Sequence, residues 1–139
     1  MKLTTFISAG AFIFFSAFAM KKEADKQLSP LYDRKWSLKK IYIADSSEVV
    51  SGKAFIKFNE QKKSAGGNGG CNSFGSSITV SGCTISFKNI FSTKMYCEGV
   101  QQTEDAYFKQ LQKVNRFAIK DKVLLLYMDN EVLLEFESE

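Results

Sequence analysis

The sequence contains no histidine, and this absence excludes more than any motif in the chain indicates. Without an imidazole, neither Ser-His-Asp nor Cys-His nucleophilic catalysis can operate. Zinc sites that need a histidine ligand are excluded for the same reason. We therefore expect a protein that is not an enzyme, with no catalytic residue, no cofactor and no metal site.

A large excess of one charge is also missing. The chain has 19 Lys and Arg against 15 Asp and Glu, a formal net charge of +4. The basic pairs, such as Lys39-Lys40 and Lys62-Lys63, stand among acidic or apolar neighbours and not in a long cationic run. Because a nucleic-acid footprint needs a concentrated basic face interleaved with aromatic residues, we expect no nucleic-acid partner.

Long apolar runs are confined to the amino terminus. Met1-Lys2 is a minimal positive region, and an apolar stretch then leads to Ala17-Phe18-Ala19, the small-x-small pattern that signal peptidase recognises. The run from residue 3 to 19 barely reaches the ~20 residues that span a bilayer, which leaves an uncleaved anchor as the alternative. We expect residues 1–19 to be a signal peptide cleaved after Ala19, and the product to be periplasmic or secreted, in the cell envelope.

The remainder is long enough for one domain. Residues 20–30 are charged, poor in large apolar groups and end at the only proline, Pro30, so they are predicted to form a flexible tether. Residues 31–137 then alternate polar and apolar positions, which predicts one packed domain.

The patterns within this domain predict mainly strands. Strands are expected at residues 32–43, 54–58, 77–80, 84–87, 117–119, 123–128 and 132–136. The first carries Trp36 as a core anchor and a bulge at Lys39-Lys40, and residues 44–53 are interpreted as a loop. A helical repeat formed by Tyr107, Phe108, Leu111 and Val114 predicts one helix, capped by Thr103. The sequence therefore predicts an α+β fold, with a mainly antiparallel sheet or partly closed barrel of about seven strands and one helix.

The glycine-rich stretch Gly66–Gly70 invites comparison with a phosphate-binding loop. No Lys-Ser/Thr pair follows it, and Asn72 occupies the position at which the third glycine of a dinucleotide motif would stand. We therefore interpret the stretch as a strand with a bulge and a tight turn.

The adjacent carboxylates Glu104 and Asp105 could in principle act as an acid–base pair. Neighbouring positions on a helix do not face each other, so the two cannot converge on one substrate atom. We attribute both to favourable electrostatics at the helix start.

Three cysteines in an exported chain predict one disulfide and one free thiol. Cys71 and Cys97 lie outside any C-x-x-C motif, which favours a structural bridge between them over a redox pair; reduced thiols are the alternative. In strict register about a Ser81-Gly82 turn, Cys83 would face Val80 and leave Cys71 too far along the strand to reach it.

Several short motifs together resemble one family. They are Trp36-x-Leu38, Gly67-x-x-Gly70-Cys71-Asn72, Thr93-x-Met95-x-Cys97, Glu104 with Phe108 and Leu111, Phe117-x-Ile119 and Leu124-x-Leu126. The pattern is similar to the META domain family, which includes the HslJ-like heat-inducible proteins of bacterial envelopes. The resemblance implies a compact, non-enzymatic envelope domain that supports stress or drug tolerance, and it implies no particular ligand.

A second interpretation is a β-barrel module that encloses a small molecule or a lipid. Of the 13 phenylalanines, five lie in the leader, and the eight that remain suffice for a core without excess. The expected partner is an unknown envelope protein or a small ligand, together with peripheral membrane association, and the expected state is a monomer.

Overall fold

A computed structural model of the protein describes residues 30–139, so the predicted signal peptide and most of the predicted tether lie outside the described residues. The described part is one antiparallel sheet with one main helix. The strands are β1 (Lys35–Ile43), β2 (Ser46–Val49), β3 (Phe55–Asn59), β4 (Ser64–Asn68), β5 (Ser73–Ser81), β6 (Thr84–Ser92), β7 (Arg116–Lys120), β8 (Val123–Met128) and β9 (Glu131–Ser138), and the helix is α2 (Gln101–Lys113). The expected α+β class with a mainly antiparallel sheet is confirmed, with nine strands in place of about seven.

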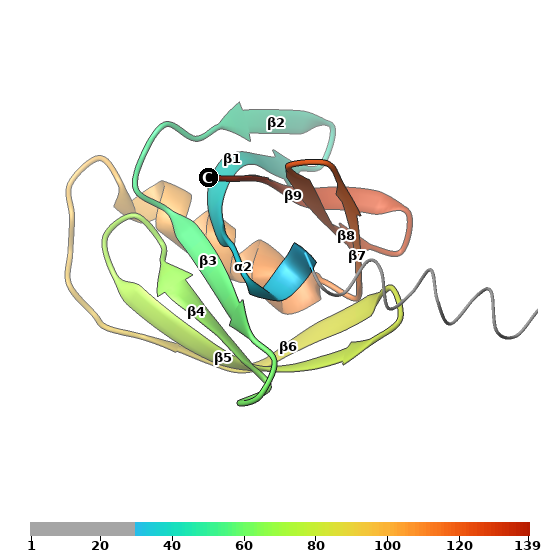
Figure 1. Ribbon diagram of the computed structural model, residues 1–139. Coiled ribbons are helices and arrows are strands. Elements are labelled where there is room, and N and C mark those ends of the chain that lie inside the picture. The colour runs from blue at the N-terminus through green and yellow to red at the C-terminus, as the bar shows by residue number, and fades with distance from the viewer. Residues whose placement is uncertain (1–29) are drawn as a thin grey trace, which may run out of the picture.

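The sheet closes on itself into a ring (Figure 1). Its order is β2-β1-β3-β4-β5-β6-β7-β8-β9, and β1 also pairs with β9. β1 divides one of its edges between two partners, since Lys35–Ser37 pair with β3 and Lys40–Ile43 pair with β2. β2 is therefore attached to the outside of the ring as an edge strand.

One strand escaped the sequence patterns. β2 lies in the segment interpreted as a loop, and all four of its residues are exposed, so no apolar alternation marks it. Pairing with β1, and not local pattern, makes it extended. β4 confirms the strand that was expected in the glycine-rich stretch, and Gly69 and Gly70 lie in the turn that follows it. The bulge expected in this stretch was wrong, because β4 pairs with β3 and β5 in an unbroken register.

Inward-facing side chains fill the ring. Trp36 is fully buried, as predicted, and its indole N–H donates to the carbonyl of Leu31 at 3.0 Å. The register of β1 against β9 shifts between Leu38 and Lys40, which confirms the bulge and returns Ile41 to the buried face. The interior is consequently a packed core.

Helix α2 packs against β6, β9 and β1. Tyr107, Leu111 and Val114 are buried as the helical repeat predicted. The prediction that Thr103 caps the helix was wrong: the N-cap is Val100, without a side-chain cap, and the Thr103 hydroxyl donates instead to Glu48 Oε1 on β2 at 3.0 Å. No helix in residues 30–139 is long and apolar enough to cross a membrane.

The β5–β6 hairpin turns one residue later than expected. Val80 pairs with Ile85 and Ser81 with Thr84, so Gly82 and Cys83 form the two-residue turn and the expected pairing of Cys83 with Val80 was wrong. Gly82 takes a φ of +57°, a conformation that glycine adopts without cost. Cys83 is a free and exposed thiol at this turn.

Candidate functional site

The β4–β5 turn meets the first turn of α2 through the side chain of Glu104. This carboxylate is 1% exposed. Its Oε2 accepts from the backbone N–H groups of Cys71 at 2.9 Å and Asn72 at 2.6 Å, and its Oε1 accepts from Asn72 Nδ2 at 2.6 Å. Three donors on a buried carboxylate make a charge-assisted joint between helix and sheet.

The Asn72 side chain extends the joint to the segment after β6. It is 2% exposed, and its Oδ1 accepts from the backbone N–H of Met95 at 2.8 Å and the hydroxyl of Thr93 at 2.9 Å. Its Nδ2 donates to the Met95 carbonyl at 3.0 Å as well as to Glu104. Both polar atoms of the amide are therefore used to hold backbone and side chains of the protein itself.

A disulfide lies beside this joint. It links Cys71 to Cys97 with their Cα atoms 5.8 Å apart and 26 positions apart in sequence. Because Cys97 stands just before α2, the bridge ties the β4–β5 turn covalently to the start of the helix.

Glycines make the close approach possible. A Cβ on Gly69 would lie 2.6 Å from Phe108 Cζ and 2.7 Å from Glu104 Cγ. Gly70 has a φ of +118°, and a Cβ there would lie 2.7 Å from Val100. The turn can pack against α2 only because these positions carry no side chain.

Six of the seven motif residues singled out in the sequence are thereby brought to one place. Gly70, Cys71, Asn72, Thr93, Met95 and Cys97 lie in or beside the junction of the β4–β5 turn, the β6–α2 segment and α2. We call this set, with Glu104, the junction. Gly67 lies within β4, where an added Cβ would meet the Phe55 carbonyl of β3.

Sequence reasoning missed the role of Glu104, which was attributed to helix-start electrostatics. Glu104 shares the apolar face of α2 with Tyr107 and Leu111, three and seven positions later, and a charged residue on an apolar stripe was the available signal. Asp105 behaves as expected for an exposed neighbour and accepts from Gln101 Nε2 at 2.9 Å. The two carboxylates do not converge.

The chemistry open to the junction is limited. Both oxygens of Glu104 accept hydrogen bonds from the protein, and the N–H groups of the glycine-rich turn that could face an anion, at Cys71 and Asn72, are already bound to it. Within residues 30–139, no group of three or more His, Cys, Asp and Glu side chains could hold a metal ion. The hydrogen bonds of the junction hold the β4–β5 turn and the segment after β6 against α2.

Two surface hollows adjoin the junction. One of about 450 Å³ lies between the β2–β3 connection, Gly69-Gly70 and the helix start at Val100 and Thr103. A smaller one of about 260 Å³ is lined by Met95, Tyr96 and the α2 residues Gln101, Asp105 and Phe108.

The fold and the junction define a class of protein: a closed antiparallel ring covered by one helix, with a glycine-rich turn locked to that helix. The model of the META domain family matches residues 29–139, and the chain belongs to this family, which confirms the resemblance. Among curated proteins, none matches the chain significantly. The META domain family is not a known group of enzymes.

Solved structures share the fold at low sequence identity. A protein from Burkholderia xenovorans, solved by NMR, superposes with a TM-score of 0.67 at 22% identity, over 100% of this chain and 99% of that one. A DUF4847 family protein from Bacteroides vulgatus, solved by crystallography, gives 0.57 at 13% identity, over 78% of this chain and 94% of that one. These likenesses establish the fold.

Proposed function

We propose that the protein is an exported, non-enzymatic META domain of the cell envelope that acts by binding and supports tolerance of stress or drugs. The observation that carries the proposal is the junction, where the side chains of Glu104 and Asn72 make their hydrogen bonds to other groups of the protein. The residues that define the family pattern therefore stabilise the fold. We infer that the protein acts through its exposed surface.

The disulfide supports export. Disulfides persist in oxidising compartments and are rare in the reducing cytosol. The Cys71–Cys97 bridge in the described domain therefore agrees with the signal-peptide pattern that ends at Ala19.

Cell fractionation with intact-mass analysis tests the export. We expect the protein outside the cytosol, with the mass of a chain that begins at Met20. After unfolding without reductant, one thiol should react with an alkylating agent. A cytosolic protein of full length with three reactive thiols would contradict the proposal.

The role in tolerance is tested by deletion of the gene. We expect lower survival under heat or envelope-directed drugs, restored by the full chain and not by a matched chain that lacks residues 2–19. Restoration by the leaderless chain would place the function in the cytosol and overturn the proposal. A hydrolytic activity that co-purifies with the protein and is lost when an exposed residue is replaced would also overturn it.

The second candidate, a small-molecule or lipid carrier, is restricted by the packed interior, since Trp36, Tyr107, Phe117 and Phe136 fill the ring. A carrier function would therefore use a surface site, and the hollow of about 450 Å³ beside Gly69-Gly70 is the candidate for it. Native mass spectrometry of protein purified from its own cells distinguishes the two, because a co-purifying ligand favours the carrier.

A further inference from the structure

Charge is distributed unevenly along the described chain. Residues 49–97 contain six lysines and one acidic residue, Glu60, whereas the rest of residues 30–139 contains nine basic and 12 acidic residues. The segment 49–97 includes strands β3 to β6. A nearly neutral protein therefore has one cationic half.

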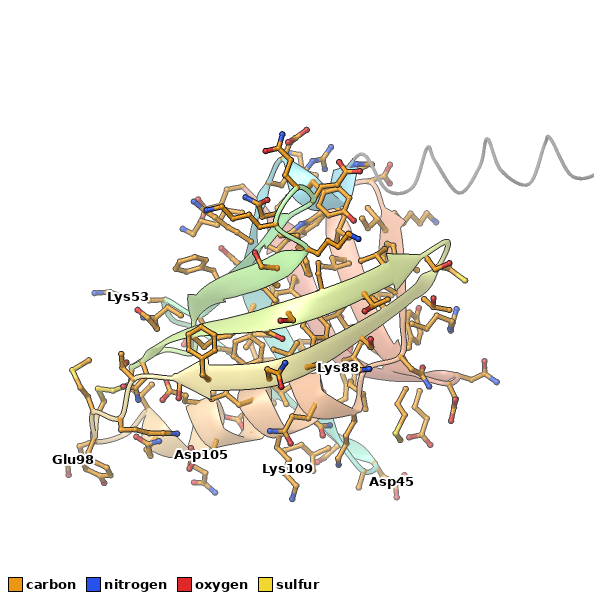
Figure 2. All side chains as sticks on the ribbon, turned by 90° about the horizontal axis from the view of Figure 1, so that it is seen from below. Asp45, Lys53, Lys88, Glu98, Asp105 and Lys109 are labelled. Atoms are coloured by element: carbon orange, nitrogen blue, oxygen red, sulfur yellow. A yellow bond between two sulfur atoms is a disulfide. The ribbon has the colours of Figure 1, made fainter. Side chains whose placement is uncertain are left out.

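The register places part of this charge on the outer face of the sheet. One cross-strand row runs from Lys57 through Gly66 and Gly75 to Phe91, and a second runs from Asn59 through Ser64 and Ser77 to Lys88. Lys57, Lys88 and Phe91 are exposed, and the residues between them are small. In Figure 2, Lys88 lies on this outer face and Lys53 at its edge, while Asp105 and Lys109 project from α2 alongside it.

Apolar side chains gather at the edge of this face, where Phe91 lies on β6 and where Met95 and Tyr96 follow the strand and line the hollow shared with α2. Phe91, Met95 and Tyr96 are 70%, 59% and 78% exposed, and they are three of the five large hydrophobic side chains that are exposed in the described part. Phe91 leans its ring over Gly75, where an added Cβ would lie 2.6 Å from its Cζ. We call residues 91–96 the apolar rim.

The junction holds the apolar rim in place. The Asn72 amide bonds both the N–H and the carbonyl of Met95, and Tyr96 immediately precedes the bridged Cys97. The rim backbone is therefore ordered before it meets any partner, which lowers the entropy lost on binding.

We propose that the outer face of β3–β6 and the apolar rim dock on a bilayer surface that carries anionic lipids. The lysines lie against the headgroups, as juxtamembrane basic residues do, and Phe91, Met95 and Tyr96 enter the interfacial layer. A soluble polyanion would match the lysines but would leave the rim in water, so the combination of charge and apolar side chains favours the bilayer. Acidic side chains border this surface: Asp33 lines a hollow together with Lys57 and Gly66, Glu60 lies at the β3–β4 turn, and Glu98 and Asp105 lie beside the apolar rim. This inference rests on the proposed function, which it completes by naming the partner.

Vesicle sedimentation tests the inference with pure phosphatidylcholine vesicles and with vesicles that also contain phosphatidylglycerol. Wild type is compared with the double variant Lys57→Gln/Lys88→Gln and with the matched control Lys120→Gln/Lys122→Gln, in which both lysines are exposed and lie at the β7–β8 turn, outside residues 49–97. All proteins share one amino terminus, so its contribution cancels. Each lysine near an anionic surface contributes about fivefold to partitioning, so K57Q/K88Q should bind phosphatidylglycerol vesicles on the order of 25-fold more weakly, and the control should stay close to wild type.

The apolar contribution is tested by Tyr96→Ser, which alters one exposed side chain and leaves the junction intact. Partitioning should fall roughly tenfold. The factor should be the same at low and at high salt, because salt screens charges and not the burial of apolar surface. Equal binding to both vesicle types, equal losses in test and control variants, or lysine-dependent binding to a soluble polyanion without vesicle binding would each overturn the inference. The proposed function would survive these outcomes, because the compartment is measured in cells and vesicle binding is measured on purified protein.

Discussion

Glu104 is a carboxylate that accepts three hydrogen bonds from the β4–β5 turn while 1% exposed. Its replacement by glutamine keeps the shape but turns an NH₂ group toward N–H donors. Hydrogen bonds to charged groups contribute about 1.5–3 kcal/mol each, so we expect Glu104→Gln to lower the free energy of unfolding by about 2–4 kcal/mol. Urea denaturation measures the change.

Asp105 provides the matched control for this prediction. It is exposed and lies next to Glu104 on α2, so Asp105→Asn removes the same charge from the same turn. We expect a change within about 0.5 kcal/mol. If both variants lose the same stability, the charge of the helix start is responsible and the hydrogen bonds of Glu104 are not.

Tyr107 has a hydroxyl that is fully buried and has no hydrogen-bond partner in the described part of the chain. Burial raises its pKa well above the usual value. Above about pH 10 the unfolded chain loses this proton and the folded protein keeps it, so the stabilisation is complete below that pH and declines as the pH rises. The loss attributable to this group approaches ~1.4 kcal/mol per pH unit.

Tyr107→Phe should remove that part of the alkaline decline. At neutral pH it should be neutral or stabilise by about 1 kcal/mol, since it deletes an unpaired buried hydroxyl without a change of shape. Thermal unfolding between neutral and alkaline pH measures both effects, with the exposed-site variant Tyr96→Phe as control. A clear destabilisation at neutral pH would mean that the hydroxyl has a partner.

At the scale of elements, the disulfide connects the β4–β5 turn to the segment that precedes α2. It closes a loop across 26 positions, and in the chain-entropy model a loop of this size stabilises by roughly 3 kcal/mol. We expect Cys71→Ser/Cys97→Ser to lose about this much in urea denaturation, whereas Cys83→Ser, at the exposed hairpin turn, should lose little. A large loss in the Cys83 variant alone would show that the free thiol has a structural role.

At the scale of the whole molecule, the ring has one weak joint. β6 and β7 pair only at Thr84 and Arg116, while β8 and β9 pair along their length. Local opening follows the least supported contacts, so we expect the Phe117 N–H, which donates to the Cys83 carbonyl at 2.9 Å, to exchange faster than amides of the β8–β9 ladder. Native-state hydrogen exchange provides both sets in one experiment, and equal protection would contradict a weak joint at β6–β7.

Much of the molecule is determined by the sequence itself. Alternating side chains in β1, β3, β5, β6 and the three carboxy-terminal strands, and the helical repeat of α2, identify their inward faces because periodicity is a local property. The bulge at Lys39-Lys40 and the burial of Trp36 follow from the same patterns. The short motifs around Cys71 and Cys97 were enough to indicate the family.

Only the tertiary structure decided the rest, because it depends on contacts between distant segments. β2 is a strand because β1 pairs with it, and the ring closes because β1 meets β9. Glu104 becomes a structural acceptor only when α2 lies against the β4–β5 turn, 32 positions away from Asn72. Likewise, lysines that look dispersed along the chain gather on one face only when cross-strand register aligns Lys57 and Lys88 with the small residues between them.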